Sequence, residues 1–316
     1  MTDYKLSVII PTYNRVNFIA ETLECILNQT LKPYEIIVVD QNSQDNTVEF
    51  LKQNYAGKII LIENKGNRAP GAGRNLGLKA ATGDYIQFFD SDDVMTKNKF
   101  ESQITKLANS NSGGIYSPYV MSIKDSEKGW LQNSVILQSE DSKLGKHTLK
   151  QMLKGFFVPL PAYIFKKELI DDIGFWREDI FAYEDYDYLF RMFANGLKPI
   201  FTNECCTFYR VHQNQITGGN FTDNQRDQDK IKCLKKLISD FSDILSSREI
   251  AIAKTQIHRV ESGVNSTNIS SLMYNITNIS LRIENKINRL ITKTDWQMIH
   301  KPNCDKQLFE KYKQML

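Results

Sequence analysis

The chain has 316 residues, of which 41% are hydrophobic, 24% charged and 11% aromatic, with only 16 Gly and 8 Pro. This is the composition of a packed globular protein, and it excludes fibrous and disordered classes. The formal charge of +3 is too small for a nucleic-acid-binding protein, which would carry a dense face of Lys and Arg.

Short apolar runs alternate with helical patterns over the first hundred residues, which is typical of a largely parallel sheet built from βαβ units. The expected strands are rich in β-branched and aromatic residues and cover residues 6–10, 35–39, 58–62 and 85–89. The expected helices between them cover residues 16–29, 46–54 and 72–81. A capping cluster at residues 42–45 precedes the second helix, and Gly83 follows the third as a stop signal.

Farther along the chain, the pattern predicts further strands and helices and then an appended helical region. The expected strands cover residues 115–122, 130–137, 198–201 and 205–209, and the expected helices cover residues 148–154 and 184–195. After Gly218 and Gly219 the chain becomes polar and helical, beginning with an amphipathic helix at 225–246. We therefore expect an α/β domain over residues 1–220 and an α-helical extension over residues 221–316.

The extension is basic, with 16 Lys and Arg residues against 11 Asp and Glu, whereas residues 1–220 carry a net charge of −2. Its apolar stripe favours packing on the first domain or on a second copy of the chain, which would make a homo-oligomer. Its positive charge leaves open a peripheral contact with an anionic membrane surface.

The five cysteines contain no C-x-x-C pair, so neither a disulfide framework nor a zinc ribbon is expected. The first residues lack a signal-peptide pattern, and no apolar run approaches the ~20 residues of a membrane span. These features favour the cytoplasm, either free or at the inner face of a membrane.

The sharpest chemical feature is Asp90-Ser91-Asp92-Asp93, directly after the apolar strand at 85–89. Strand ends of an open α/β sheet normally build the ligand crevice. Two carboxylates one residue apart can face one hard cation such as Mg²⁺ or Mn²⁺, completed by phosphate oxygens of a substrate. The alternative is a solvated acidic turn without a cation. Only the motifs around these residues can distinguish the two interpretations.

Two further features lie near other strand ends. Asp40 ends the second strand, where its carboxylate can accept a hydrogen bond from a nucleobase N–H or cap a helix. The spacing of Gly71, Gly73 and Gly77 is G-x-G-x-x-x-G and does not fit a dinucleotide fingerprint. Arg74 within this run is still a good phosphate or nucleotide contact.

An acidic and aromatic run, residues 183–188, opens the helix expected at 184–195. Aromatic neighbours can stack on a sugar and can raise the pKa of a carboxyl group toward general-base work. The alternative is an acidic first turn that the helix dipole favours. His212, near the end of the first domain, is a candidate ligand, although a lone His is more often structural.

In this order, the motifs resemble the inverting family 2 glycosyltransferases, which have a GT-A fold. That fold is a Rossmann-like mixed sheet that binds a nucleotide and is flanked by helices. The resemblance covers residues 5–212 and rests on a series of motifs: S-V-I-I-P-T-Y-N-R from Ser7, E-I-I-V-V-D ending at Asp40, G-R-N-L-G from Gly73, F-D-S-D-D from Phe89, Y-E-D from Tyr183, and Y-R-x-H ending at His212.

The resemblance implies a role for each matching residue. Asp185 would be the catalytic base, and Asp92, Asp90 and His212 would hold Mn²⁺ or Mg²⁺. The residues implied to bind the nucleotide-sugar are Pro11, Thr12, Tyr13, Asn14, Asp40, Arg74, Asp90, Ser91 and Glu184. Asp40 would contact the uracil. The implied activity moves one sugar from a nucleotide-sugar, a UDP-sugar, to a hydroxyl of a glycan or lipid-linked acceptor in surface-polysaccharide synthesis.

The sequence departs from the family pattern in two places. Gln41 replaces a second Asp, and no Q-x-x-R-W motif follows Asp185, which speaks against a processive synthase. Two other functions stay open. A sugar nucleotidyltransferase also uses paired carboxylates and a metal, but Pro11-Thr12-Tyr13-Asn14 is not the Gly-rich basic loop it needs. A catalytically silent GT-A scaffold is the other, and the intact carboxylates speak against it.

Overall fold

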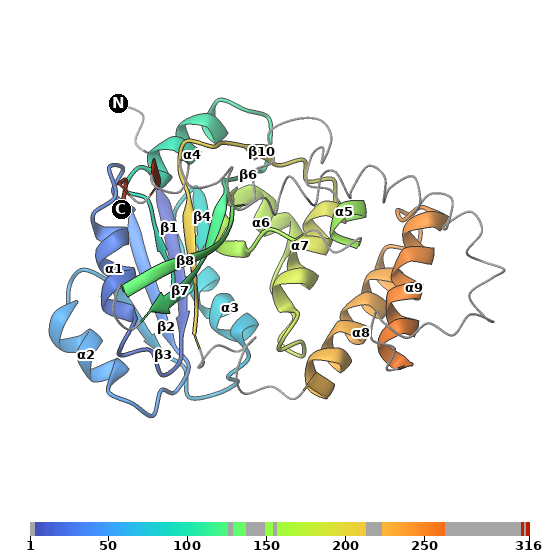
Figure 1. Ribbon diagram of the computed structural model, residues 1–316, viewed down its shortest axis with the longest axis horizontal. Coiled ribbons are helices and arrows are strands. Elements are labelled where there is room, and N and C mark those ends of the chain that lie inside the picture. Colours follow the sequence, from blue (N-terminus) through green and yellow to red (C-terminus); the bar gives the residue numbers. More distant parts are fainter. Residues whose placement is uncertain are drawn as a thin grey trace.

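A computed structural model of the chain describes residues 4–125, 129–136, 149–153, 157–212, 223–262, 311–312 and 314–316. The strands in these ranges form a seven-stranded and a four-stranded sheet. Helices lie on both faces of the larger sheet, and two further helices extend from one side of it (Figure 1). The chain is therefore a mixed α/β protein, as the sequence predicts.

Four parallel strands make up the first part of the large sheet. The central strand β1 (Leu6–Thr12) pairs with β2 (Glu35–Asp40) on one side and with β4 (Tyr85–Phe88) on the other, and β3 (Ile60–Glu63) pairs with β2. The connecting helices are α1 (Ile19–Leu27), α2 (Thr47–Asn54) and α3 (Pro70–Ala80). Because the strands are parallel, their carboxyl ends meet at one edge of the sheet, where the candidate site lies.

The alternation of side chains along β1 explains why helices cover both faces. Leu6, Val8 and Ile10 pack with α1, α2 and α4 (Lys99–Ala108). Ile9 points the other way and packs in the core cluster that contains α3 and α7 (Glu184–Ala194). All four side chains are fully buried, as expected for a strand inside a three-layer α/β fold.

The second part of the large sheet contains an antiparallel insertion. Strand β9 (Tyr163–Lys166) lies antiparallel between β4 and β6 (Gly114–Tyr116), and β10 (Ile200–Phe201) pairs with the far side of β6. The 3₁₀ helix η1 (Leu160–Ala162) precedes β9, and helix α6 (Lys167–Ile173) follows it.

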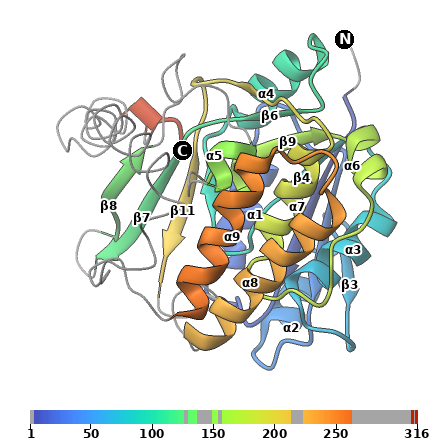
Figure 2. The same cartoon turned by 90° about the vertical axis from the view of Figure 1, so that its right-hand side faces the viewer.

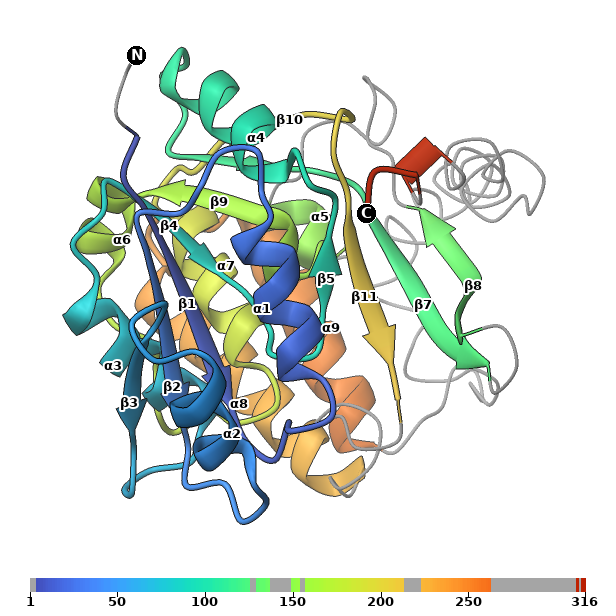
Figure 3. The same cartoon turned by 90° about the vertical axis from the view of Figure 1, so that its left-hand side faces the viewer.

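The small sheet lies beside the large one, in the order β5 (Val94–Met95), β11 (Thr207–Val211), β7 (Tyr119–Asp125) and β8 (Gly129–Ile136) (Figure 3). Tyr312, near the C-terminus, is fully buried against Val120, Cys206 and Phe208 of this region. Part of the region expected to be a helical extension therefore packs on the α/β core.

Helices α8 (Asp223–Asp240) and α9 (Ser247–Glu261) pack against α7 and α5 (Leu149–Leu153) (Figure 2). Leu234 and Leu237 of α8 are buried in the same core cluster as α7. The apolar stripe of this helix thus packs on the chain itself. No helix in the described ranges is both long and apolar enough to cross a bilayer.

The structure places the expected strands and helices of the first hundred residues within three residues of their predicted ends. Of the capping cluster predicted at residues 42–45, Asp45 accepts the N–H of Thr47, the first residue of α2, at 2.9 Å. The N-cap position itself is Asn46, which makes no side-chain cap bond. The predicted helix at 225–246 ends at Asp240, and the helical character expected for residues 263–310 lies outside the described residues.

Candidate active site

The candidate site forms where β1, β2 and β4 end. Thr12, the last residue of β1, pairs with Asp40, the last residue of β2, and β4 pairs with the other side of β1. The turn Asp90 to Asp93 follows β4 directly and therefore lies at the same edge. As predicted from the sequence, the acidic turn and Asp40 share this edge of the sheet.

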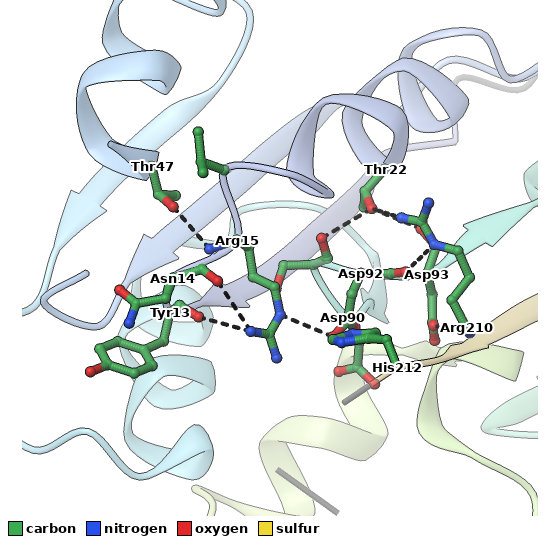
Figure 4. A network of polar contacts seen from close by, with 12 residues as sticks. Tyr13, Asn14, Arg15, Thr22, Thr47, Asp90, Asp92, Asp93, Arg210 and His212 are labelled. Atoms are coloured by element: carbon green, nitrogen blue, oxygen red, sulfur yellow. Dashed lines mark hydrogen bonds and ion pairs between the residues drawn. The ribbon is translucent and has the colours of Figure 1, made fainter. Parts of the chain in front are cut away.

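Asp92 is the centre of a buried polar network (Figure 4). Its Oδ2 accepts a hydrogen bond from Arg15 Nε at 3.0 Å and lies 3.0 Å from His212 Nε2. The ring of His212 stacks on Phe18, with 4.3 Å between the ring centroids. Burial alone would raise the pKa of Asp92, but the hydrogen bond to His212 and the charge of Arg15 outweigh it and lower the pKa below its ordinary value. Asp92 is therefore held as an anion.

Asp93, the neighbouring carboxyl group, has a structural position. It is fully buried, and its Oδ1 accepts the backbone N–H of Arg210 at 2.9 Å. The guanidinium of Arg210 in turn bonds to the carbonyl oxygen of Asp92 and to the carboxylate of Glu21. Burial and the charges of Asp92 and Asp90 raise the pKa of Asp93 well above its ordinary value. This pair ties β11 to the acidic turn and so places His212, which follows β11, against Asp92.

Arg74 joins the acidic turn to α7. Its guanidinium donates to Glu184 Oε1 at 2.9 Å and to Asp90 Oδ1 at 3.1 Å, and it lies 4.7 Å from the centroid of the Trp176 ring. The Arg74 side chain is only 5% exposed, so both contacts are largely shielded from water. Because Arg74 is the shared cation of both carboxylates, removing it would leave Glu184 and Asp90 without a compensating charge.

Asp185 lies in the first turn of α7, next to Glu184. Its Oδ1 accepts the backbone N–H of Tyr186 at 2.8 Å. Burial and the adjacent Glu184 carboxylate raise the pKa of Asp185 to about 8, although the charge of Arg74 opposes them. The ring of Tyr186 stacks on Phe157, with 4.1 Å between centroids, and Tyr183 lies beside it. Asp185 is thus a carboxyl group with a raised pKa beside an aromatic wall.

The residues expected to bind the nucleotide lie at the ends of β1 and β2. Asp40 is 1% exposed, and its two oxygens accept the backbone N–H of Ser43 at 2.9 Å and the hydroxyl of Ser43 at 2.5 Å. Asn14 has a positive φ of 52°, and its side chain accepts the N–H of Gln44 at 2.7 Å, so the two strand ends are joined. Tyr13 is 38% exposed and presents its ring at this edge.

Three more of the expected site residues are placed by the same turns. Pro11 and Thr12 belong to β1, and Thr12 is 2% exposed. Ser91 is 6% exposed, and its carbonyl oxygen lies 3.1 Å from the hydroxyl of Thr22, which fixes the acidic turn on α1. The structure thus brings Asp90, Asp92, His212, Arg74, Glu184 and Asp185 into one region, with the β1 and β2 residues along its edge.

The side chains expected to hold a divalent cation are oxygen and imidazole donors, which Mg²⁺ and Mn²⁺ accept. Asp92 Oδ2 and His212 Nε2 are 3.0 Å apart, which is about the separation of neighbouring ligands around a cation with bonds of about 2.1 Å. Across the described parts of the chain, no group of three or more His, Cys, Asp or Glu side chains is arranged to hold a cation. Asp92 and His212 could therefore supply two neighbouring ligands to a divalent cation, which is fewer than such an ion takes.

Three residues of the network had no predicted role. Arg15 is the last residue of the S-V-I-I-P-T-Y-N-R motif, and Arg210 belongs to the Y-R-x-H motif, two residues before His212. Their positions in these motifs are the sequence features that could have indicated a role. Trp176 lies 102 positions after Arg74 in the chain, and nothing in the local pattern connects the two.

The sequence matches the family model described as Glycosyl transferase family 2 over residues 7–174. The UDP-Glc:alpha-D-GlcNAc-diphosphoundecaprenol beta-1,3-glucosyltransferase WfaP of Escherichia coli is 30% identical over 229 residues, which cover 72% of this chain and 86% of that protein. An uncharacterized glycosyltransferase of Rickettsia felis is 41% identical over 133 residues, or 42% of this chain. This chain spans only 22% of the Rickettsia protein.

Solved structures with the same architecture include residues 1–349 of S. aureus TarS in complex with UDP-GlcNAc. The two structures superpose with a TM-score of 0.62 at 20% sequence identity. The superposition covers 87% of this chain and 77% of the TarS chain. The mannosyltransferase PcManGT from Pyrobaculum calidifontis, in complex with GDP-Man and Mn²⁺, has a TM-score of 0.54 at 16% identity and covers 94% and 84% of the two chains. At these identities the likeness concerns the fold, and it confirms the GT-A architecture that the sequence predicts.

Proposed function

This chain belongs to glycosyltransferase family 2, and from that premise we propose that it moves one sugar from a UDP-sugar to a hydroxyl group of a lipid-linked or glycan acceptor. The proposed transfer depends on a divalent cation and inverts the anomeric configuration. The absence of a Q-x-x-R-W motif after Asp185 in the sequence supports a single transfer for each acceptor.

The observation that carries this proposal is the pair of hydrogen bonds made by Arg74. They link Glu184, which is next to Asp185, to Asp90, which is next but one to Asp92. A carboxyl group with a raised pKa and the carboxylates suited to a diphosphate site therefore belong to one buried network. Such a network supports a reaction in which a proton is taken at one end while negative charge develops at the other.

Asp185 is the proposed general base. It would take the proton of the acceptor hydroxyl while the hydroxyl oxygen bonds to the anomeric carbon of the donor. The bond between that carbon and the diphosphate oxygen breaks in the same step, and the nucleoside diphosphate leaves with the electron pair. Attack from the face opposite the leaving group inverts the anomeric centre. The raised pKa of Asp185, about 8, makes it a stronger base than an ordinary Asp.

Asp92, Asp90 and His212 are the proposed holders of Mn²⁺ or Mg²⁺. When bound, such an ion neutralises charge on the departing diphosphate. Arg15, which bonds to the carboxylate of Asp92, adds a positive charge on the same side. Asp93 and Arg210 would keep the acidic turn and His212 in place without contacting the donor.

The nucleotide is proposed to lie along the ends of β1 and β2, against Pro11, Thr12, Tyr13 and Asn14. The bonds from Ser43 fix the Asp40 carboxylate, and its remaining lone pairs can accept a uracil N–H. Two similar proteins support a UDP-sugar, since the name of WfaP includes UDP-Glc and TarS was solved in complex with UDP-GlcNAc. The name of WfaP also supports an acceptor sugar on a lipid diphosphate. As part of the proposal, this acceptor lies at the inner face of a membrane.

The test is a donor panel. UDP-, GDP- and dTDP-sugars are each incubated with a GlcNAc-diphosphate-lipid acceptor, with Mn²⁺, with Mg²⁺ and with chelator, and both nucleotide release and sugar transfer are measured. The variants are Asp92→Ala and, as the matched control, Asp84→Ala, which is exposed and lies before the opposite end of β4. We expect UDP release and transfer from one UDP-sugar, lost with chelator and in Asp92→Ala and kept in Asp84→Ala.

Two results would contradict the proposal. Release of pyrophosphate without an acceptor would identify a sugar nucleotidyltransferase. Failure to bind or turn over any donor, with this acceptor or with free saccharides, would identify a silent scaffold with a GT-A fold.

A further inference from the structure

Helix α8 packs against α7 (Figure 2), and four of its residues also bond to the loop that leads into α7. The contacting residues of α8 are three or four positions apart and therefore lie on one face of the helix: they are Asp229, Lys232, Lys236 and Asp240. The loop comprises residues 177–183 and ends directly before Glu184 and Asp185. The family model ends at residue 174, so neither the loop nor α8 belongs to the matched range.

Asp229 makes the contact nearest to the catalytic end of the loop. Its Oδ2 accepts the backbone N–H groups of Phe181 at 3.1 Å and of Ala182 at 2.9 Å. Its Oδ1 accepts the side-chain amide of Gln225 at 3.2 Å. The residue is 4% exposed, so these bonds are made in a largely water-free place, where an unpaired backbone N–H would be costly. One carboxylate on α8 thus fixes two consecutive peptide groups of the loop.

The other contacts repeat this pattern toward the start of the loop. Lys232 and Lys236 place their ammonium groups 2.8 and 3.0 Å from Asp179 Oδ2. Asp240 bonds to Arg177, whose guanidinium also donates to Asp187 of α7 at 2.5 Å. The bonds from α8 therefore hold the loop at three places: residues 181–182, Asp179 and Arg177.

Helix α3 holds the preceding part of the same segment from the other side. Asn75 accepts the backbone N–H of Trp176 at 2.8 Å and donates to the carbonyl oxygen of Trp176 at 3.0 Å and to Glu178 at 2.8 Å. The segment is therefore fixed between two helices, and only Tyr183 separates Ala182 from the start of α7.

We infer that α8 is part of the catalytic machinery, and that Asp229 is a positioning residue for the general base through its bonds to Phe181 and Ala182. The inference rests on the role proposed above for Asp185. A displacement of a catalytic group by about 1 Å can cost about 100-fold in turnover, so a loop that is free to shift would weaken catalysis while the donor site at the strand ends stays intact. The helical extension then serves the reaction directly and is more than a solvated or oligomerising appendage.

The test compares three variants of the full chain. Asp229→Ala removes both acceptors, Asp229→Asn keeps one oxygen that can face the two N–H groups, and Asp243→Asn is the matched control on an exposed carboxylate just after α8. Three measurements are made: donor kinetics, which give kcat and KM; calorimetry, which gives the Kd of UDP; and mass spectrometry of hydrogen exchange at the amides of residues 179–186.

We expect Asp229→Ala to lower kcat by about 10- to 100-fold, to leave the donor KM and the UDP Kd within about threefold, and to speed exchange at residues 181 and 182. Asp229→Asn should recover most of kcat and of the exchange protection. Asp243→Asn should behave as the wild type in all three measurements. The inference is overturned if Asp229→Ala keeps its kcat and its exchange protection, or if kcat and UDP binding fall together.

Two features keep the test decisive. Exchange and UDP binding need no turnover, so a chain that transfers no sugar would refute the proposed function while the loop contact is still tested. If Asp229→Ala does not fold, the double variant Lys232→Gln and Lys236→Gln replaces it, because both lysines are more than a third exposed. It should speed exchange around Asp179 and lower kcat by about two- to fivefold, and unchanged values in both would overturn the inference.

Discussion

Asp185 combines two properties that a general base needs at neutral pH, namely a raised pKa and a fixed position at the first turn of a helix. We predict that Asp185→Asn lowers kcat by about 10²–10⁴-fold and leaves the Kd of UDP nearly unchanged, because the amide has the shape of the carboxyl group and takes no proton. Steady-state kinetics and calorimetry on the same preparation check this. Preserved turnover in Asp185→Asn would refute its role as the base.

The loss of Arg74 should lower the stability of the folded chain. Arg74→Met leaves Glu184 and Asp90 as partly buried carboxylates without their cation. We predict a loss of about 3 kcal/mol in the free energy of unfolding, measured by urea denaturation at pH 7. Arg74→Lys is the control. It should lose less of the free energy of unfolding, because it keeps the positive charge but not the planar guanidinium that bonds to both carboxylates. A stability equal to that of the wild type in Arg74→Met would contradict the network described here.

At the scale of elements, α3 lies unusually close to β1. A Cβ atom on Gly77 would collide with the side chain of Ile9, which is fully buried. We predict that Gly77→Ala destabilises the protein by about 1–3 kcal/mol, because α3 must move away from the sheet. Gly66→Ala is the control, since Gly66 lies in an exposed turn and the nearest contact of an added Cβ is an Asn side chain at 3.3 Å. Equal effects of the two substitutions in urea denaturation would count against this close packing.

The sequence predicts the elements that have a strong local pattern and misses those that depend on distant partners. Strands β1, β2 and β4 are apolar runs followed by turn residues, so their pattern is visible locally. Strand β9 has only four residues and is defined by antiparallel pairing with β4 and β6, which a local pattern does not encode. The boundary at residue 220 stays a prediction, and α8 beyond it shares a core with α7.

Some residues of the site follow a local sequence pattern, and others meet only through the packing of distant elements. The carboxylates of Asp90 and Asp92 follow a strand end, so their pattern alone places them at the sheet edge. The bond between Arg74 and Glu184 joins residues 110 positions apart, and the contact of Asp229 with Ala182 joins residues 47 positions apart. Such pairs arise from how the helices pack on the sheet, which no spacing in the sequence reveals.

At the scale of the whole molecule, buried carboxyl groups make stability depend on pH. Burial raises the pKa of Asp90, Asp93, Glu184 and Asp185 above the ordinary value of about 4. The folded chain therefore keeps protons that the unfolded chain loses, so this stability is present in mild acid and is lost as pH rises toward about 8. Burial lowers the pKa of Lys99 to about 7, which has the opposite effect only above that pH.

We therefore predict that the melting temperature falls between pH 5 and pH 7. Above pH 7 it should level off, because the opposite effect of Lys99 then offsets the remaining loss from the carboxyl groups. Asp185→Asn should fall less steeply and melt higher than the wild type at pH 7, by roughly 5 °C. Differential scanning calorimetry in buffers of equal ionic strength checks both statements. A melting temperature that rises from pH 5 to pH 7 would contradict the assigned directions.

In the proposed sugar transfer from a nucleotide donor, Asp185 accepts the proton of the acceptor hydroxyl. The most direct measurement is the pH dependence of kcat/KM for that transfer, in the wild type and in Asp185→Asn. We predict that the wild-type value rises about tenfold per pH unit in acid and levels off near pH 8, where Asp185 loses its proton. The residual activity of Asp185→Asn should lack this rise. The same rise in both proteins would show that another group takes the proton.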